Sequence, residues 1–358
     1  MTAEVKPVEE HWPNGALKLR REMAEDLRGR VVANGVETLY AADGTKQSET
    51  TYHLGVKEGP WREFFGNGKV RIEGNFRRGQ KEGVETRYSE SGEKSAEINF
   101  HDGQLEGKRF DWNGRQKTYE ADYHKDLLNG TLQKWHSTGT PELVAHYRDG
   151  VQDGPEQRWY SDGKKFSEAN YEAGKKTGEY REWYPGGQPK YFALFKNGQP
   201  EGKFQEWFVD GALKGQGQYV EGSPDGAWKE WYELEDAIGR QRKAEPGAEP
   251  PAHQLSAERS YRHGTLHGKQ LLYHENGQKR LAVTVVDGKR EGPYTEWYAN
   301  GQVRATGKYR RDQLHGEIDY WYDDGKPWAV NNYDRGTPVG HWIEWDRDGK
   351  VITDENRS

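Results

Sequence analysis

Glycine recurs in this sequence with a period of 24 residues, and this spacing restricts the chain to a repeat architecture. The segment from Gly174 to Gly198 contains one unit, which we expect to have a wider Gly-x-x-x-Gly turn at its start and a tight Pro-Gly-Gly turn in its middle. Of the 45 glycines, 36 fall at three fixed positions of this unit. Because each unit of such an array packs mainly on its neighbours, the 358 residues need not divide into ordinary globular domains.

The residues between the glycines predict β-hairpins. Asn67-Gly68 and Asp210-Gly211 are examples of a turn pair that favours a type I′ turn, which needs positive φ at both central residues. Runs such as 61–65 are rich in aromatic residues, which favour strands, and no part of the repeat region shows a convincing helical period. We therefore predict an all-β fold, an elongated antiparallel β-hairpin array of 24-residue repeats with about 13 to 14 hairpins.

Departures from the period set the expected boundaries. About five extra residues near Leu27–Val31 indicate an atypical capping hairpin over residues 1–34. Between Tyr232 and Tyr261 there are 18 extra residues, rich in Pro and charge, at the position of an Asn/Asp-Gly turn. The expected order is the cap (1–34), the array (35–232), a flexible insertion (233–260), the array again (261–350) and a frayed polar tail (351–358).

Composition excludes several classes of function. A formal charge of −6 provides no basic surface for nucleic acid, and the absence of cysteine excludes disulfides and thiolate chemistry. No run approaches the ~18 apolar residues of a transmembrane segment. The first residues contain no signal-peptide core, so we expect a cytoplasmic protein, or a periplasmic or envelope protein if a signal sequence has been removed.

Aromatic residues recur in columns, which argues against disorder despite a mean hydropathy of −1.20. The first column lies five residues after the glycine that closes each Gly-x-x-x-Gly turn; Trp207 belongs to it, and we expect it to form the core. Neighbouring residues of a strand face opposite sides. The aromatic residues directly after the first column should therefore lie on the other face of the sheet. We expect them to form an exposed row that binds a peptide, a coiled partner or a glycan, and the alternative is that they only pack within the fold. This candidate partner-binding row is Tyr160, Tyr184, Phe208, Tyr232, Tyr298 and Tyr322.

An acidic column precedes the closing glycines. It is either a rail for a basic partner or a turn position that favours a solvated residue. Its members are Glu58, Glu82, Glu106, Asp153, Glu201, Asp225 and Glu291.

Catalysis requires different side chains that converge, whereas polar residues here form repeating columns. The densest histidine group is His263, His267 and His274, and His315 follows His267 by two repeats, a separation of about 19 Å that is too long for shared metal ligation. We expect no enzyme activity, no catalytic residues, no metal and no cofactor.

The pattern Tyr-x-x-Gly-x-x-x-Gly-x-(Trp/Tyr)-x-x-Trp-Tyr-x-x-Gly resembles the MORN repeat in its bacterial variant form. The segments 197–208 and 287–298 carry the resemblance, which extends over about residues 35–350. It implies an extended hairpin array used for protein contacts, for assembly and sometimes for lipid association. The bacterial variant is often labelled a toxin–antitoxin component of the YwqK antitoxin type, and no catalytic residues are attached to the family.

We therefore expect a non-enzymatic scaffold with a protein partner, of which an antitoxin or immunity protein is one version. The alternative is an envelope structural or glycan-binding protein that uses exposed aromatic rows. A peripheral contact with a membrane remains open, as does the oligomeric state.

Overall fold

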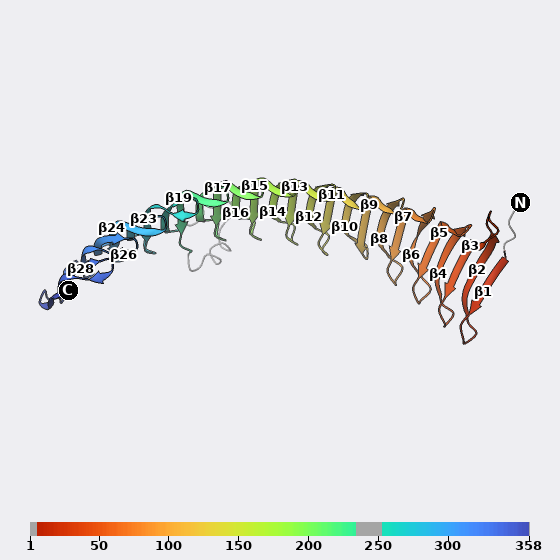
Figure 1. Ribbon diagram of the computed structural model, residues 1–358, viewed down its shortest axis with the longest axis horizontal. Coiled ribbons are helices and arrows are strands. Elements are labelled where there is room, and N and C mark those ends of the chain that lie inside the picture. Colours follow the sequence, from red (N-terminus) through yellow and green to blue (C-terminus); the bar gives the residue numbers. More distant parts are fainter. Residues whose placement is uncertain (1–5, 234–252, 358) are drawn as a thin grey trace. The chain divides into compact units, whose positions relative to one another are not determined.

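The structure, a computed structural model, describes residues 6–233 and 253–357, and every regular element in these ranges is a β-strand (Figure 1). These ranges contain no helix long and apolar enough to cross a membrane. The all-β class and the antiparallel hairpin repeat are thus confirmed. The chain divides into two compact units, residues 1–164 with 171–174 and residues 165–170 with 175–358.

In the described part of the first unit, from residue 6 onward, there are thirteen complete strands, and the next strand, β14 (Lys165–Glu172), has residues in both units. The thirteen are β1 (Lys6–His11), β2 (Leu17–Glu25), β3 (Val31–Tyr40), β4 (Lys46–His53), β5 (Val56–Phe64), β6 (Val70–Arg77), β7 (Gln80–Tyr88), β8 (Lys94–His101), β9 (Gln104–Asn113), β10 (Gln116–His124), β11 (Leu127–Trp135), β12 (Pro141–Arg148) and β13 (Val151–Trp159).

The remaining strands belong to the second unit. They are β15 (Lys175–Trp183), β16 (Pro189–Lys196), β17 (Gln199–Trp207), β18 (Leu213–Val220), β19 (Ser223–Trp231), β20 (Leu255–Arg262), β21 (Thr265–Leu266), β22 (Gly268–Tyr273), β23 (Lys279–Val286), β24 (Lys289–Trp297), β25 (Val303–Arg310), β26 (Gln313–Leu314), β27 (Gly316–Trp321), β28 (Pro327–Asp334), β29 (Thr337–Pro338), β30 (Gly340–Trp345) and β31 (Val351–Arg357).

Strand pairing follows the chain. From β1 to β13, and again from β15 to β20, each strand pairs antiparallel with the next one. Later in the second unit, three strands are each divided into a short and a longer piece that pair with the same preceding strand, β21 with β22, β26 with β27 and β29 with β30. Each repeat therefore supplies an outgoing strand, such as β17, and a return strand, such as β18.

The two kinds of turn have exchanged the roles expected from the sequence. Asn197 and Gly198 have φ of 53° and 85°, and Lys196 pairs directly with Gln199, so the type I′ turn lies in the Gly-x-x-x-Gly segment. The closing glycine, here Gly202 (φ 89°), already lies inside the outgoing strand. The prediction of type I′ turns at Asn67-Gly68, Asp210-Gly211 and the equivalent pairs in the middle of each repeat is therefore wrong.

The Asn/Asp-Gly pairs in the middle of the repeat, such as Asn67-Gly68, form longer loops. In the loop between β5 and β6, the Phe65 N–H donates to the Lys69 carbonyl (2.8 Å) and the Gly68 N–H to the Phe65 carbonyl (2.9 Å). Of the pair Asn67-Gly68, only the glycine has a positive φ, 79°. This geometry matches a three-residue loop that ends in a left-handed glycine.

The core lies two residues after the closing glycine. This column, which we call the core column, contains Phe204 (7 % exposed) and Ile318 (0 %), whereas Trp207 of the expected core is only partly buried. We call the aromatic column five residues after the closing glycine, which includes Trp183, Trp207 and Trp345, the Trp row. The expectation that the Trp row forms the core is wrong. The large buried members of the core column are Trp61, Leu132, Phe204, Trp228, Tyr294, Ile318 and Trp342.

Small residues on the return strands make room for the core column. Phe204 pairs with Gly217 on one side and with Ala193 on the other, and Ala193 is fully buried. Residues five positions after the closing glycine are three residues beyond the core column, so strand alternation places them on the opposite face.

Two boundaries differ from expectation. Residues 255–260, expected in the flexible insertion, belong to β20, because Leu255 must pair with Trp231 to continue the sheet. The expected tail 351–358 supplies β31, the return strand of the last described hairpin, over Val351–Arg357. The Tyr232 N–H donates to the Gln254 carbonyl at 2.9 Å, the bond that closes an ordinary Asn/Asp-Gly loop, and residues 234–252 lie outside the described residues.

Candidate functional site

All seven carboxylates of the acidic column lie beside the type I′ turn of the following repeat. Each accepts a hydrogen bond from the backbone N–H of the first residue of that turn, a residue that has positive φ in every case. We call this contact the carboxylate clasp. The pairs are Glu58 with Arg78 (2.6 Å), Glu82 with Asp102 (3.0 Å), Glu106 with Lys125 (3.1 Å), Asp153 with Ala173 (3.5 Å), Glu201 with Glu221 (2.7 Å), Asp225 with His263 (3.0 Å) and Glu291 with Arg311 (2.9 Å).

The clasp gives the acidic column a structural role. A residue other than glycine is strained at positive φ, and the carboxylate provides a partner for its N–H. The hydrogen bond from the Asp102 N–H lowers the pKa of Glu82, and hydrogen bonds from His124 and then from the Lys125 N–H lower the pKa of Glu106. Glu82 and Glu106 are therefore held in the ionised form. Because all seven carboxylates bond to the next repeat, the column requires no basic ligand to account for it.

One group in the described ranges has the composition of a metal site. Ligand atoms of Glu82, His101 and Asp102 all lie within 4.8 Å of one another at the surface. The two oxygens of Glu82 are engaged, one by the clasp and one by Nδ1 of His101 at 3.2 Å. The hydrogen bonds of the turn therefore explain this group.

The histidines that the sequence grouped have separate partners. His267 lies 3.2 Å from the carboxylate of Asp287, and Nε2 of His274 lies 2.9 Å from the carbonyl of Trp297. The structure does not bring them together at one site.

The candidate Tyr row joins neighbouring repeats. Each of these tyrosines occupies the first position of a loop, and four hydroxyls donate to the carbonyl of the aromatic residue that ends the outgoing strand of the next repeat. These bonds run from Tyr184 to Trp207 (2.8 Å), from Tyr232 to Tyr273 (2.7 Å), from Tyr298 to Trp321 (2.9 Å) and from Tyr322 to Trp345 (2.8 Å). Tyr160 occupies the same position, with its N–H bonded to the Lys164 carbonyl. The tyrosines are half-buried, and inter-repeat bonding accounts for the row without a partner.

Phe208, the remaining member of that row, is covered. It is 5 % exposed, and the ring of His253 stacks on it with the centroids 4.8 Å apart. Nε2 of His253 lies 2.7 Å from Asp210 and Nδ1 lies 2.7 Å from the Tyr232 carbonyl, with the His and Asp side chains each 1 % exposed. Sequence reasoning missed this cluster because His253 enters it from the far end of the insertion.

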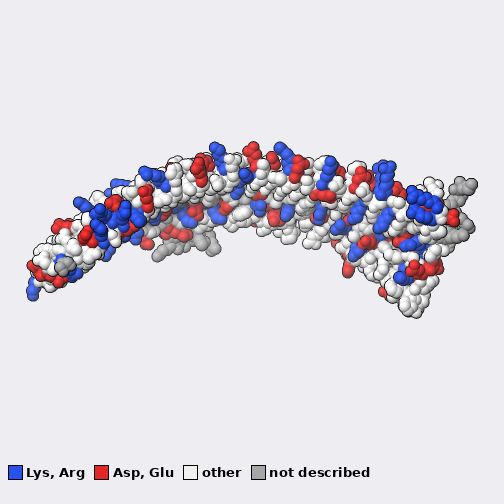
Figure 2. All heavy atoms as spheres, viewed as in Figure 1, with Lys and Arg blue, Asp and Glu red and all other residues white. Residues whose placement is uncertain are grey.

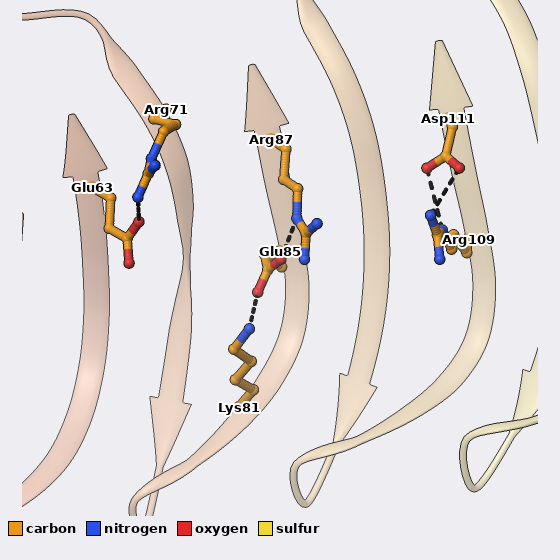
Figure 3. Close-up of polar contacts among 7 residues, drawn as sticks. All are labelled: Glu63, Arg71, Lys81, Glu85, Arg87, Arg109 and Asp111. Carbon is orange, nitrogen blue, oxygen red and sulfur yellow. Dashed lines mark hydrogen bonds and ion pairs between the residues drawn. The ribbon is translucent and has the colours of Figure 1, made fainter. Parts of the chain in front are cut away.

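The core column of the first unit contains buried acids. Glu85 is 2 % exposed and contacts Lys81 and Arg87, while the neighbouring repeat has Arg109 paired with Asp111 at 2.9 Å (Figure 3). Figure 3 also shows a cross-strand pair, Glu63 with Arg71, which joins β5 and β6. Two further buried acids, Glu37 and Glu156, are paired with Arg21 and Arg158. Removing one partner of a buried ion pair destabilises the fold by more than the intact pair stabilises it. We therefore assign these pairs a role in the packing of neighbouring strands and not in catalysis.

The Trp row lies on the face opposite the core column, and its rings are half-buried. Successive outgoing strands hold these rings one repeat apart, with the start of a return strand between them. We call the space between two successive rings a slot.

Several slots are filled by a lysine of the return strand. In the first unit, Lys94 lies 5.7 Å from the Trp112 ring and Lys117 lies 5.5 Å from the Trp135 ring. Each lysine also pairs with the glutamate three residues later, Glu97 at 2.5 Å and Glu120 at 2.8 Å.

Two slots of the second unit are open clefts. One, of about 560 Å³, lies between Trp183 and Trp207 and is lined by Pro189 and Phe192. The other, of about 500 Å³, lies between Trp321 and Trp345 and is lined by Pro327 and Val330. The Pro and the apolar residue replace the Lys and Glu of the filled slots.

Charge on the visible face is mixed. Figure 2 shows Lys and Arg side chains interspersed with Asp and Glu, without a large area of one sign. This face therefore offers no extended basic surface of the kind that binds nucleic acid.

Comparison with known proteins agrees with the fold. Five segments match the family described as MORN repeat variant, residues 57–78, 152–173, 176–197, 266–286 and 290–311, and these matches support a MORN-repeat protein. MORN repeats generally suggest a scaffold for protein or membrane binding, and they are typically non-catalytic. The comparison with curated proteins found no match.

Similar solved structures include the crystal structure of TcdB2-TccC3 and the same protein without its hypervariable C-terminal region. Both are 10 % identical with a TM-score of 0.16, and the match covers 98 % of this chain but 24 % and 22 % of those chains. The chain thus spans about a quarter of their length, and a TM-score this low carries no argument.

Proposed function

We propose that this protein is a non-enzymatic repeat scaffold that binds another protein through its Trp row. The observation that carries the proposal is the half-buried state of these rings. The core column, the carboxylate clasps and the Tyr bonds already hold the repeats together. The Trp row therefore keeps aromatic surface available, and aromatic side chains are the commonest anchors of protein interfaces.

An antitoxin or immunity protein is one version of this scaffold, because neutralising a toxin requires only a complementary surface. Co-expression with candidate toxins, scored by growth, tests that version. Cells that remain inhibited with every candidate would speak against it.

A glycan-binding role at the cell envelope is the second candidate, favoured by the same rings. The open clefts combine Trp rings with polar neighbours such as Arg181 and Gln205, an arrangement that suits a sugar ring. Binding to immobilised polysaccharides would support this candidate over the first.

The main proposal is tested by cross-linking and affinity capture from cytoplasmic and envelope fractions of the native cell. The test variant combines Trp207→Ala, Trp297→Ala and Trp345→Ala, and the control combines Val151→Ser and Val286→Ser, two exposed positions outside the row. We expect the first variant to lose the captured partner and the control to keep it, with both still folded by circular dichroism. Equal capture by the two variants, or no specific partner for the wild type, would refute the proposal.

A further inference from the structure

The slot between Trp183 and Trp207 has the width of one inserted side chain. These residues end β15 and β17, and β16 lies between them. Strands ~4.8 Å apart place the two backbones ~9.6 Å apart. Two van der Waals contacts of ~3.5–4.0 Å take up most of this distance, so the slot has room for one flat or aliphatic group between the two Trp side chains.

The floor of the slot is apolar and its rim is charged, with the cations Arg181 and Lys203 and the acids Glu179 and Glu182. Glu182 is paired with Lys190 at 3.0 Å. Phe192 pairs with Arg181 on one side and with Gln205 on the other, and Pro189 pairs with Trp183. The Lys203 ammonium lies 5.8 Å from the Phe192 ring, and among the described residues it forms no ion pair. Arg181 lies 5.6 Å from the same ring and is paired with Glu179. Lys203 is thus a cation available to a ligand at the edge of an apolar slot.

The residue types of the return strand decide whether a slot is open. A lysine at or next to the first position of the return strand reaches the next ring of the row, and the glutamate three residues later pairs with its ammonium, as in Lys117 with Glu120. Pro189 has no long side chain, and Phe192 offers no carboxylate. Since the filled version is stable elsewhere in this chain, the fold does not require the open version.

We propose that this slot binds an extended segment of a partner protein that presents a proline or aromatic side chain next to an acidic residue. The ring enters between Trp183 and Trp207, and the carboxylate meets Lys203. Aromatic-lined grooves take proline-rich segments because such segments are already extended and lose little entropy on binding. This inference rests on the proposed function and names the segment that the scaffold recognises.

The second open slot provides an internal control. Between Trp321 and Trp345 the cleft is lined by Asp319, Asp348 and Lys326. The Lys326 ammonium already donates to the Arg347 carbonyl at 2.7 Å, so acids predominate at this rim. A peptide with an acidic residue is expected to prefer the Trp183–Trp207 slot over this one.

The test uses the full chain and four synthetic probes. These are an acidic proline–tryptophan peptide, its counterpart with lysine in place of the acids, an acidic peptide without proline or aromatic residues, and cellopentaose. Affinities are measured by calorimetry and by the change in Trp fluorescence. The closed-slot variant is P189K/F192E, which copies the filled slots, and its matched control is P327K/V330E, which closes the other cleft.

We expect the acidic proline–tryptophan peptide to bind the wild type and P327K/V330E equally, and P189K/F192E at least about tenfold more weakly, the loss typical of one aromatic anchor. Lys203→Glu is expected to reverse the preference between the acidic and the lysine peptide. The closed-slot variant should keep the circular dichroism spectrum and melting temperature of the wild type.

Equal binding to the open and the closed slot would overturn the inference, as would equal affinity for the acidic and the lysine peptide. Binding of cellopentaose without peptide binding would overturn it in favour of a glycan site. If the native partner is captured equally by the wild type and by P189K/F192E, the slot inference fails while the proposed scaffold function stands.

Discussion

Gly217 is the position where one added methyl group most directly tests the packing of the core column. A Cβ at this residue would lie 2.3 Å from Cδ2 and 2.4 Å from Cε2 of Trp228. Ordinary contacts between carbon atoms are ~3.5–4.0 Å, so the added Cβ would be more than ~1 Å too close to the Trp228 ring. The φ of Gly217 is not positive, so Gly217→Ala introduces a clash without backbone strain.

The Trp228 ring has little freedom to move away. It is 9 % exposed, stacks on Phe204 with centroids 5.1 Å apart and meets the edge of Tyr219 at 5.2 Å. Overpacking of a core in this way costs about 1–3 kcal/mol. We therefore expect Gly217→Ala to lower the free energy of unfolding of this part of the array by that amount.

Gly215 in the same strand is the matched control. The nearest atom to its added Cβ would be Cε1 of Phe204 at 3.8 Å, an ordinary contact. Gly215→Ala should be neutral or stabilise by up to about 1 kcal/mol, since alanine reduces the entropy of the unfolded chain.

Urea unfolding followed by Trp fluorescence and circular dichroism measures both variants. A Trp228→Leu background adds a second test, because Leu132 packs across from Ala145 in a native repeat. The alanine at position 217 should cost less in that background than in the wild type. Equal losses at the two glycines, or the same cost in both backgrounds, would show that the Trp228 ring does not pack over Gly217.

Three further predictions concern contacts between repeats. Glu201→Ala removes one carboxylate clasp and should cost about 1 kcal/mol, measured by urea unfolding, with Glu201→Gln losing less because an amide oxygen still accepts the bond. The pKa values of Glu82 and Glu106 are lowered in the folded protein, so their contribution to stability is complete above the unfolded pKa of ~4.3 and is lost as pH falls through the folded pKa. The protection factors of the amides in the adjoining type I′ turns, which correct exchange for its intrinsic pH dependence, should fall only in that acidic range, and a fall between pH 5 and 7 would contradict this. His253→Ala leaves Asp210 buried without its partner and should cost about 3–5 kcal/mol in thermal or urea unfolding, whereas no loss would mean that the pair is not buried in solution.

The period of the sequence was enough to predict the strands but not the roles of the two turns. Asn67-Gly68 carries the strongest type I′ signal, yet the loop there spans three residues. The true two-residue turn at Asn197-Gly198 was hidden because Gly202, four residues later, made the segment look like a longer loop. A glycine inside a strand can mark a bulge, and this possibility decides the assignment only once the strand register is known.

The core column was hidden by its variety. The equivalent positions hold Glu85, Arg109, Phe204, Gln270 and Ile318, whereas the Trp row is uniform and therefore looked like the core. The Trp row keeps one residue type because the same surface environment recurs in every repeat. The core column varies because each of its residues packs against different neighbours.

The acidic column could be found in the sequence, but its role could not. The hydrogen bond from the Glu221 N–H to Glu201 crosses from one repeat to the next, between residues 20 positions apart. Sequence spacing alone does not show that the turn of one repeat lies beside the carboxylate of the previous one.

The carboxylate clasp also affects how such a chain can change in evolution. Its donor is a main-chain N–H, which every residue except proline possesses, and the turn residues that supply it include Arg78, Ala173 and His263. The carboxylate therefore does not depend on the identity of the side chain that it meets. A repeat that is duplicated, deleted or moved finds a compatible neighbour at once, so the array can change in length without the paired substitutions that a side-chain contact would require.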